Sequence, residues 1–242
     1  MNDRALWITW YDLPEQDRDA WLEWAHSEYI PALLERSGFL HIAHYASIPR
    51  REMSHNRKRL ERTTDRDVPA GDRYILIVAA EHAHAFGDPT PGALHASLPA
   101  AMQEMLTKRV GVRENVMVEA ARVSGPEEKI YPDGMKLAPC IQLGSFTCGW
   151  QNEEELLAWY TQWRMRAMQT LPGCIRTRRL ASVAGWAKHA ILYEFTSREM
   201  RDRYFPHHDA DRPDMKDWSD RTVAYITHAP GSANVATRLW PA

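Results

Sequence analysis

The fold is decided by two segments of the chain, RYILIVAA at residues 73–80 and HAILYEFT at residues 189–196. Both are rich in β-branched and aromatic residues, and both contain nearly continuous apolar runs instead of an alternation of apolar and polar residues. Such runs are typical of strands that are buried on both faces. Each segment therefore predicts a strand at the centre of a sheet that is covered on both sides.

The elements around residues 73–80 follow a β-α-β-β-α-β order. The other predicted elements are strands at 6–11, 39–48 and 114–123, and helices over 18–36 and 93–109, the second of them bent or divided by Pro99. This order is the ferredoxin-like arrangement. One such unit covers one face of its sheet with two helices and leaves the other face bare, so the bare face must pack against something else.

The second half of the chain repeats this order. Its predicted elements are strands at 139–148, 174–181, 189–196 and 233–240, a helix over 152–171 and a broken helical region over 197–227. Trp24 and Gly38 are 14 positions apart, as are Trp159 and Gly173, so these parts of the halves match at an offset of 135. At the third strand, ILI at 75–77 matches ILY at 191–193 at an offset of 116, which puts a length difference of 19 residues in the preceding loop.

We therefore expect an α+β protein of two tandem ferredoxin-like repeats, residues 1–128 and 129–242. Their sheets should pack bare face against bare face and form an intramolecular α+β barrel. The protein should then be a monomer with an internal pseudo-dimer, or a homodimer.

Two stretches resemble a known group of proteins. WLEWAHSEYIPALLERSGFLHIAHY at 21–45 resembles the EthD-like branch of the dimeric α+β barrel superfamily, and HAPGSANVATRLWP at 228–241 is similar to the end of two-domain bacterial relatives. The resemblance implies this fold and a cleft. It does not imply one reaction, because the superfamily includes isomerases, cyclases, decarboxylases, cofactor-free monooxygenases and haem enzymes. Function must therefore be argued from the site.

His26 is the first candidate for chemistry. It lies at the margin of the apolar face of its predicted helix, where an imidazole reaches a cleft and keeps access to solvent. Its unperturbed pKa of about 6.5 suits proton transfer at neutral pH. The matching residue in the second half is Thr161, so we expect a single site in the first repeat. The alternative is a histidine that only hydrogen-bonds a neighbour.

Strand residues supply the other candidates. His41 and His44 are separated by an odd number of positions, so they lie on opposite faces of their strand. His41 and Tyr45 share a face about 13 Å apart and could contact one ligand together with Tyr11. The alternative is aromatic packing in the barrel wall. The predicted catalytic residues are His26, Tyr11, His41 and Tyr45, and the predicted substrate-binding residues are Trp10, Tyr29, His44 and Tyr74.

These residues predict a cofactor-independent enzyme that acts on an aromatic or cyclic organic acid, ketone or quinone. Histidine-mediated proton transfer would support isomerase, dehydratase, decarboxylase or monooxygenase chemistry. One alternative is a haem protein of the chlorite dismutase-like type, with an axial ligand on a helix of the second half among His207, His208 and His228, besides the strand residue His189. Another is a non-catalytic protein that binds a ligand in the same cavity.

Composition narrows the classes of partner and the compartment that the protein is expected to have. The net charge of −2 gives no electrostatic support for a nucleic acid partner. No stretch of about 18 apolar residues is present to cross a membrane, and no signal peptide fits the N-terminus. Three cysteines without a CxxC pair indicate a reducing compartment, and the histidines match no recognised metal-ligand spacing. We expect a cytoplasmic protein without a metal site.

Overall fold

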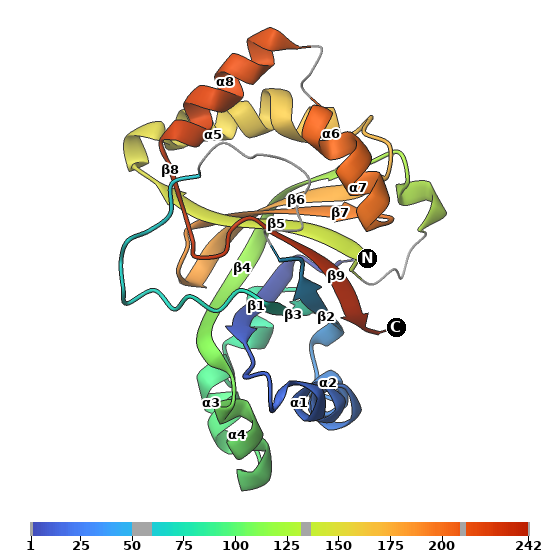
Figure 1. Cartoon of the computed structure of the whole chain (residues 1–242), viewed down its shortest axis with the longest axis vertical. Helices are drawn as coiled ribbons and strands as arrows, with labels where there is room; N and C mark the ends of the chain where they lie inside the picture. The colour runs from blue at the N-terminus through green and yellow to red at the C-terminus, as the bar shows by residue number, and fades with distance from the viewer. Residues whose placement is uncertain (1, 50–59, 132–136, 209–211, 242) are drawn as a thin grey trace.

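Eight strands close into one antiparallel barrel in the computed structural model, which describes residues 2–49, 60–131, 137–208 and 212–241. The helices of the two repeats lie on opposite sides of the strands (Figure 1). This confirms the predicted α+β barrel of two tandem ferredoxin-like repeats.

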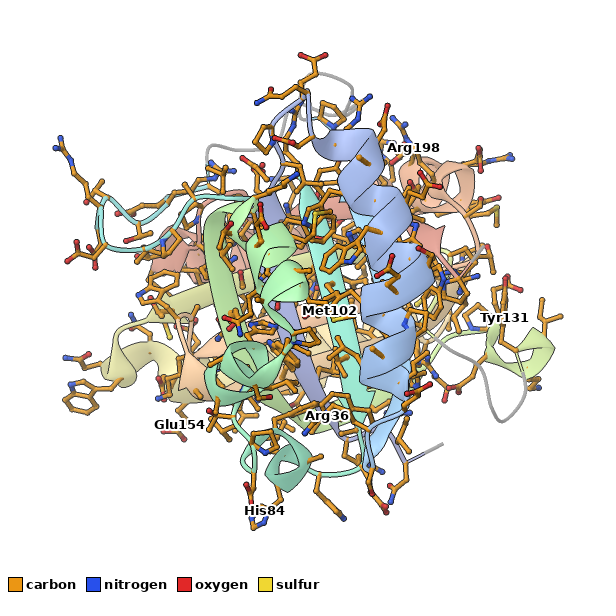
Figure 2. The ribbon with its side chains drawn as sticks, turned by 90° about the horizontal axis from the view of Figure 1, so that it is seen from below. Arg36, His84, Met102, Tyr131, Glu154 and Arg198 are labelled. Atoms are coloured by element: carbon orange, nitrogen blue, oxygen red, sulfur yellow. The ribbon has the colours of Figure 1, made fainter. Side chains whose placement is uncertain are left out.

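The first repeat has the predicted element order. Its elements are β1 (Ala5–Asp12), α1 (Arg18–Trp24), the π-helical turn η1 (Ala25–Tyr29), α2 (Ile30–Leu34), β2 (Phe39–Ser47), β3 (Tyr74–Ala80), η3 (Ala83–Phe86), α3 (Pro91–Ser97), α4 (Ala100–Thr107) and β4 (Val110–Ser124). The helix predicted over 93–109 is divided into α3 and α4 at Leu98 and Pro99, which have extended backbone conformations. Figure 2 shows α1–α2 and the α3–α4 pair side by side across the strands of this repeat.

The short helix η4 (Glu128–Ile130) precedes the elements of the second repeat, and the boundary at 128/129 stays a prediction. Its elements are β5 (Cys140–Cys148), η5 (Trp150–Asn152), α5 (Glu153–Trp159), the π-helical turn η6 (Tyr160–Arg164), α6 (Met165–Met168), β6 (Cys174–Gly185), β7 (His189–Phe195), α7 (Arg198–Tyr204), η7 (Phe205–His207), α8 (Pro213–Ala224), β8 (Ile226–His228) and β9 (Asn234–Trp240). The sequence did not predict β8, which pairs with only three residues of β5.

The barrel is closed by two seams between the repeats. The strand order is β4-β1-β3-β2 in the first repeat and β9-β5-β7-β6 in the second, so both repeats have the same internal order. β2 pairs with β9 at one seam, and β4 pairs with β6 at the other. The second strand of each repeat therefore pairs with the last strand of the other.

The two repeats agree in local detail. The π-helical turns at 25–29 and 160–164 are 135 positions apart, and Gly38 and Gly173 follow them with positive φ angles of 89° and 82°. A side chain is disfavoured at such φ values, which explains glycine at both helix ends. The extra residue of the π turn also shifts the buried face of the first helix, so that Leu33 and not Ala32 continues the face that Ala25 and Tyr29 begin.

The predicted offset of 116 at the third strand is wrong by one residue. Ala5 pairs with Ala80, and Cys140 pairs with Phe195. Because Ala5 and Cys140 correspond at an offset of 135, Ala80 and Phe195 correspond at 115. A one-residue slip moves a side chain to the other face of a sheet: Ile75 faces the barrel interior, whereas Ile191 faces the helices.

The barrel interior is packed with side chains from both repeats. Apolar residues such as Leu6, Ile8, Leu143 and Leu192 fill most of it. A buried network of Asp3, Glu119, Arg122, Arg176, Arg178 and Glu194 also links the repeats. Arg178 donates to Glu194 at 3.0 Å and lies 2.9 Å from Asp3, so it connects the N-terminus to β7.

Candidate functional site: a cavity in the second repeat and a histidine chain in the first

A well-formed cavity lies in the second repeat, between the outer face of β5 and β7 and the helices that cover it. Its volume is about 400 Å³, which is the size of a small-molecule site. Its apolar wall includes Phe146, Trp159, Tyr160, Ile191, Phe205 and Ile226. Its polar wall includes Gln142, Arg164, Tyr193, Arg201, His208, Ser219, Asp220 and His228.

The difference between the repeats explains where this cavity lies. In the first repeat, Trp7 fills the corresponding space, with ring contacts to Phe39, Phe86 and His95 at centroid distances of 5.4–6.5 Å. At the offset of 135, Trp7 corresponds to Gln142 and Thr9 to Gly144. Both second-repeat residues are smaller. The second repeat therefore has a hollow where the first has a packed aromatic core.

Arg164, at the end of η6, is the central cation of the cavity. Its Nε donates to the hydroxyl of Tyr193 at 2.8 Å, and its Nη1 donates to Nε2 of His208. The guanidinium carbon lies 4.8 Å from the ring centroid of Phe205, with the Tyr193 and Trp159 rings at 5.3 and 5.7 Å. No carboxylate of the described residues forms an ion pair with Arg164, so its charge is held by aromatic faces and neutral acceptors.

The titratable side chains around Arg164 are either neutral or already paired with another side chain. Burial, together with Arg164, lowers the pKa of His208 to about 3, and its Nδ1 donates to the carbonyl of Phe205 at 2.6 Å. Arg201 is buried and donates to the side-chain oxygen of Gln142 at 3.1 and 2.5 Å, and it pairs with Asp202. The cavity thus combines an aromatic wall with Arg164, a cation that has no carboxylate partner among the described residues. The lining also contains the carboxylate of Asp220, which pairs with Lys216.

The predicted site residues fall into two groups on opposite faces of the first-repeat sheet. His26, Tyr11, His44, Tyr29 and Tyr74 lie in the layer between the sheet and its helices. His26 is partly exposed, and its Nε2 is 2.8 Å from Nδ1 of His44. Nε2 of His44 is 2.7 Å from the hydroxyl of Tyr11. Three predicted residues therefore form one hydrogen-bonded chain from the surface to the buried layer.

The rest of this group borders the chain. Tyr74 lies 5.8 Å, centroid to centroid, from both Tyr11 and His44. It also lines a polar cavity of about 240 Å³ with Arg18 and Arg73. The hydroxyl of Tyr29 instead hydrogen-bonds His95 at 2.8 Å.

The second group, His41, Tyr45 and Trp10, lies inside the barrel. His41 is 3.6 Å from the carboxylate of Asp3, and burial lowers its pKa to about 4. Tyr45 donates to the carbonyl of Ala138 at 2.9 Å, and Arg113 lies 3.9 Å above the Trp10 ring. Tyr11 is on the other face of the sheet, so it does not share one cavity with His41 and Tyr45.

Fold and cavity define the class of protein: a tandem ferredoxin-like α+β barrel, the fold of the dimeric α+β barrel proteins, with a small-molecule-sized hollow under the helices of one repeat. Solved structures with this fold include an anthrone oxidase-like protein, which is 10% identical with a TM-score of 0.64 over 98% of this chain and 92% of its own. A candidate monooxygenase from Fusobacterium nucleatum is 8% identical, with a TM-score of 0.60 over 99% and 94%.

The encapsulated DyP-type peroxidase from Mycobacterium smegmatis is 13% identical, with a TM-score of 0.54 over 97% of this chain and 92% of its own. At these identities the likeness shows the fold alone. The sequence matches no protein-family model and no curated protein sequence.

The helix histidines of the second repeat do not fit as axial haem ligands in this arrangement. Both ring nitrogens of His208 are engaged, one by Arg164 and one by the carbonyl of Phe205, and His207 is exposed. His228 lines the cavity, but it lies on β8, and its Nδ1 is 3.3 Å from the carbonyl of Glu61. Within the described ranges, no helix is long and apolar enough to cross a membrane.

Proposed function

We propose that this protein is a small-molecule enzyme that binds an aromatic or cyclic organic acid in the second-repeat cavity. The observation that carries the proposal is the partly buried Arg164 guanidinium, which is surrounded by aromatic rings and has no carboxylate partner among the described residues. A charge in such surroundings favours an anionic ligand, and the rings suit a planar one. The name of the anthrone oxidase-like neighbour is compatible with a cyclic substrate.

The cavity residues would stabilise negative charge on the ligand. A guanidinium in a site with little water stabilises a carboxylate, or an enolate-like anion formed from a ketone, more strongly than water does. Neutral His208 holds the orientation of Arg164 by accepting from its Nη1. Gly144 leaves room in the cavity wall, since a Cβ atom at this position would lie only 3.3 Å from the side chain of Ile191.

Arg164→Met tests the binding step. We expect Arg164→Met to weaken binding of 2-naphthoate and anthraquinone-2-carboxylate by about 10- to 150-fold, because a hydrogen bond to a charged group contributes about 1.5–3 kcal/mol. Isothermal titration calorimetry measures the dissociation constants. The matched control is Arg166→Met, which removes an exposed arginine two residues away and should leave binding unchanged.

The uncharged carboxamides of the same two ring systems complete the test. They should bind the wild-type protein more weakly than the carboxylates and should be insensitive to Arg164→Met. Equal losses in the Arg164 and Arg166 variants, or equal affinity for acids and amides, would show that Arg164 does not receive the anion.

A second candidate site for proton transfer is the chain His26–His44–Tyr11, and its continuous hydrogen bonding favours it. Two tautomeric arrangements satisfy the chain. In one, Tyr11 donates to His44 and His44 donates to His26; in the other, both donations are reversed. His26 Nδ1 carries a proton in the first arrangement and is a base in the second. His26 is partly exposed, so it can take a proton from the ligand as a base and return it to water, or do the reverse as an acid, while the chain sets its tautomer.

His26→Ala tests this second site. If His26 transfers the proton, turnover of any aromatic acid, ketone or quinone found to be a substrate should fall at least about 100-fold with the fold retained. Initial rates and circular dichroism measure the two quantities. His82→Ala, which removes an exposed histidine, is the control. Unchanged turnover in His26→Ala would remove this residue from the mechanism and leave the cavity proposal intact.

A further inference from the structure

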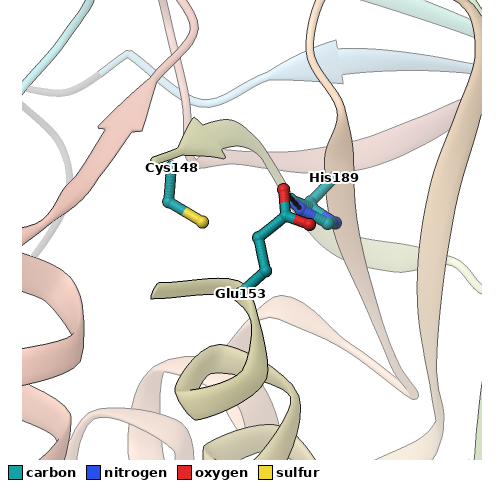
Figure 3. Close-up of side chains that lie close together, drawn as sticks. All are labelled: Cys148, Glu153 and His189. Atoms are coloured by element: carbon teal, nitrogen blue, oxygen red, sulfur yellow. Dashed lines mark ion pairs between the residues drawn. The ribbon is translucent and has the colours of Figure 1, made fainter. Parts of the chain in front are cut away.

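Three potential metal ligands of the second repeat converge beside the end of β5. Cys148 is the last residue of β5, Glu153 the first of α5 and His189 the first of β7, and their side chains point toward one another (Figure 3). One ligand atom of each lies within 4.8 Å of the ligand atoms of the other two. A thiolate, a carboxylate and an imidazole are donors that Zn²⁺ accepts, whereas Mg²⁺ and Ca²⁺ prefer oxygen alone.

The buried ring nitrogen of His189 points independently to a bound ion. Its side chain is 7% exposed, and its Nε2 atom is buried without a hydrogen-bond partner. The facing carboxylate oxygen of Glu153 is 3.5 Å away, beyond a good hydrogen bond. Buried ring nitrogens are normally paired, and leaving one unpaired costs free energy. An ion between Nε2 and the Glu153 carboxylate would satisfy both groups.

The repeat correspondence shows that this cluster is specific to the second repeat. At the offsets of 135 and 115, Cys148 corresponds to Leu13, Glu153 to Arg18 and His189 to Tyr74. None of these three first-repeat residues is a usual ligand of Zn²⁺. All three donor types therefore differ from the first-repeat residues at the same place in the fold.

We propose that Cys148, Glu153 and His189 bind one Zn²⁺ ion, with water at the fourth position. Tetrahedral bonds of about 2.0–2.3 Å place donor atoms about 3.3–3.8 Å apart, so the three atoms need to approach by no more than about 1.5 Å. Cys148 and Glu153 are half-buried, so rotamer changes at these two residues would bring the donor atoms together. Glu153 now contacts the amine of Lys188, an exposed side chain that the ion would displace.

The ion would tie together three elements that form part of the cavity wall. The Phe146 ring separates the cluster from the cavity, with its centroid 5.8 Å from that of His189 and its side chain in the cavity lining. The ion would thus stabilise the wall without contacting the ligand. This inference does not rest on the proposed function.

Metal titration of chelator-treated protein tests the site. We expect one Zn²⁺ per chain by calorimetry, with release of a proton from the Cys148 thiol. Co²⁺, used as an optical probe, should give a thiolate-to-metal charge-transfer band. Zn²⁺ should also raise the melting temperature, since it binds only the folded arrangement.

The variants identify the ligands. Cys148→Ser should abolish the thiolate band, and both Cys148→Ser and Glu153→Gln should weaken Zn²⁺ binding at least about 100-fold. Glu154→Gln, which alters the neighbouring exposed carboxylate, should bind like the wild type. Circular dichroism shows whether each variant is folded. If either Cys148→Ser or Glu153→Gln does not fold, the other ligand variant provides the test. No binding at millimolar Zn²⁺, Co²⁺ binding without a thiolate band, or equal affinity in the folded ligand variants would overturn the proposal.

Discussion

Glu194→Gln is expected to lower the free energy of unfolding by about 3–5 kcal/mol, which is the cost of breaking a buried ion pair by removing one partner. Glu194 is fully buried and receives hydrogen bonds from Arg176 at 2.6 and 3.0 Å and from Arg178 at 3.0 Å. Glutamine keeps the volume but removes the charge. The two buried guanidiniums would then share one fewer anion inside the barrel.

Urea denaturation at neutral pH measures this loss. Glu104→Gln, which alters an exposed carboxylate on α4, is the matched control and should stay within about 0.5 kcal/mol of the wild type. A loss below about 1 kcal/mol for Glu194→Gln would mean that water or side-chain movement compensates the charge. The network would then contribute little to holding the two repeats together.

The sequence predicted the fold well because duplication repeats the same physical pattern. Apolar runs at 74–80 and 189–195 required cover on both faces, and the closed barrel provides it. The helix ends at Gly38 and Gly173 fixed the offset of 135. The offset at the third strand came out one residue wrong because ILI and ILY are both apolar. In a strand buried on both faces, composition does not show which side chains face inward.

The site was harder to predict than the fold. Proximity along a strand cannot show that Tyr11 and His44 meet His26, while His41 lies on the other face beside Asp3. The second-repeat cavity did leave a signal, because Trp7 and Thr9 correspond to the smaller Gln142 and Gly144. The proposed Zn²⁺ ligands left none, because intervals of five and 36 residues match no known spacing and only folding brings these residues together.

His44→Phe is expected to make the stability of the protein less sensitive to acid. Complete burial, with His26 beside it, lowers the pKa of His44 from 6.5 to about 3 in the folded state. Between these values the unfolded chain binds a proton that the folded protein does not. The contribution of neutral His44 to the free energy of unfolding is therefore fully present above pH 6.5. It is lost as the pH falls toward 3, by about 1.4 kcal/mol per pH unit.

Urea denaturation from pH 4 to 7 measures the slope. His41, His95 and His208 also have pKa values lowered to about 4, 4 and 3 by burial, so the wild-type slope should exceed that of one proton. His44→Phe should reduce the slope of the free energy of unfolding against pH by about 1.4 kcal/mol per pH unit over pH 4–6. This reduction is expected even if the variant is less stable than the wild type at pH 7. His82→Phe removes an exposed histidine and should leave the slope unchanged.

The same slope decides how the chain His26–His44–Tyr11 could work. If His44 stays neutral in the folded protein, as its burial requires, the chain sets the tautomer of His26 but holds no charge at its centre, and His26 exchanges its proton directly with the ligand and water. An unchanged slope in His44→Phe would mean that His44 accepts a proton near neutral pH in the folded state. His26 and His44 would then share that proton, and His44 would store charge during the reaction instead of only setting the tautomer of His26.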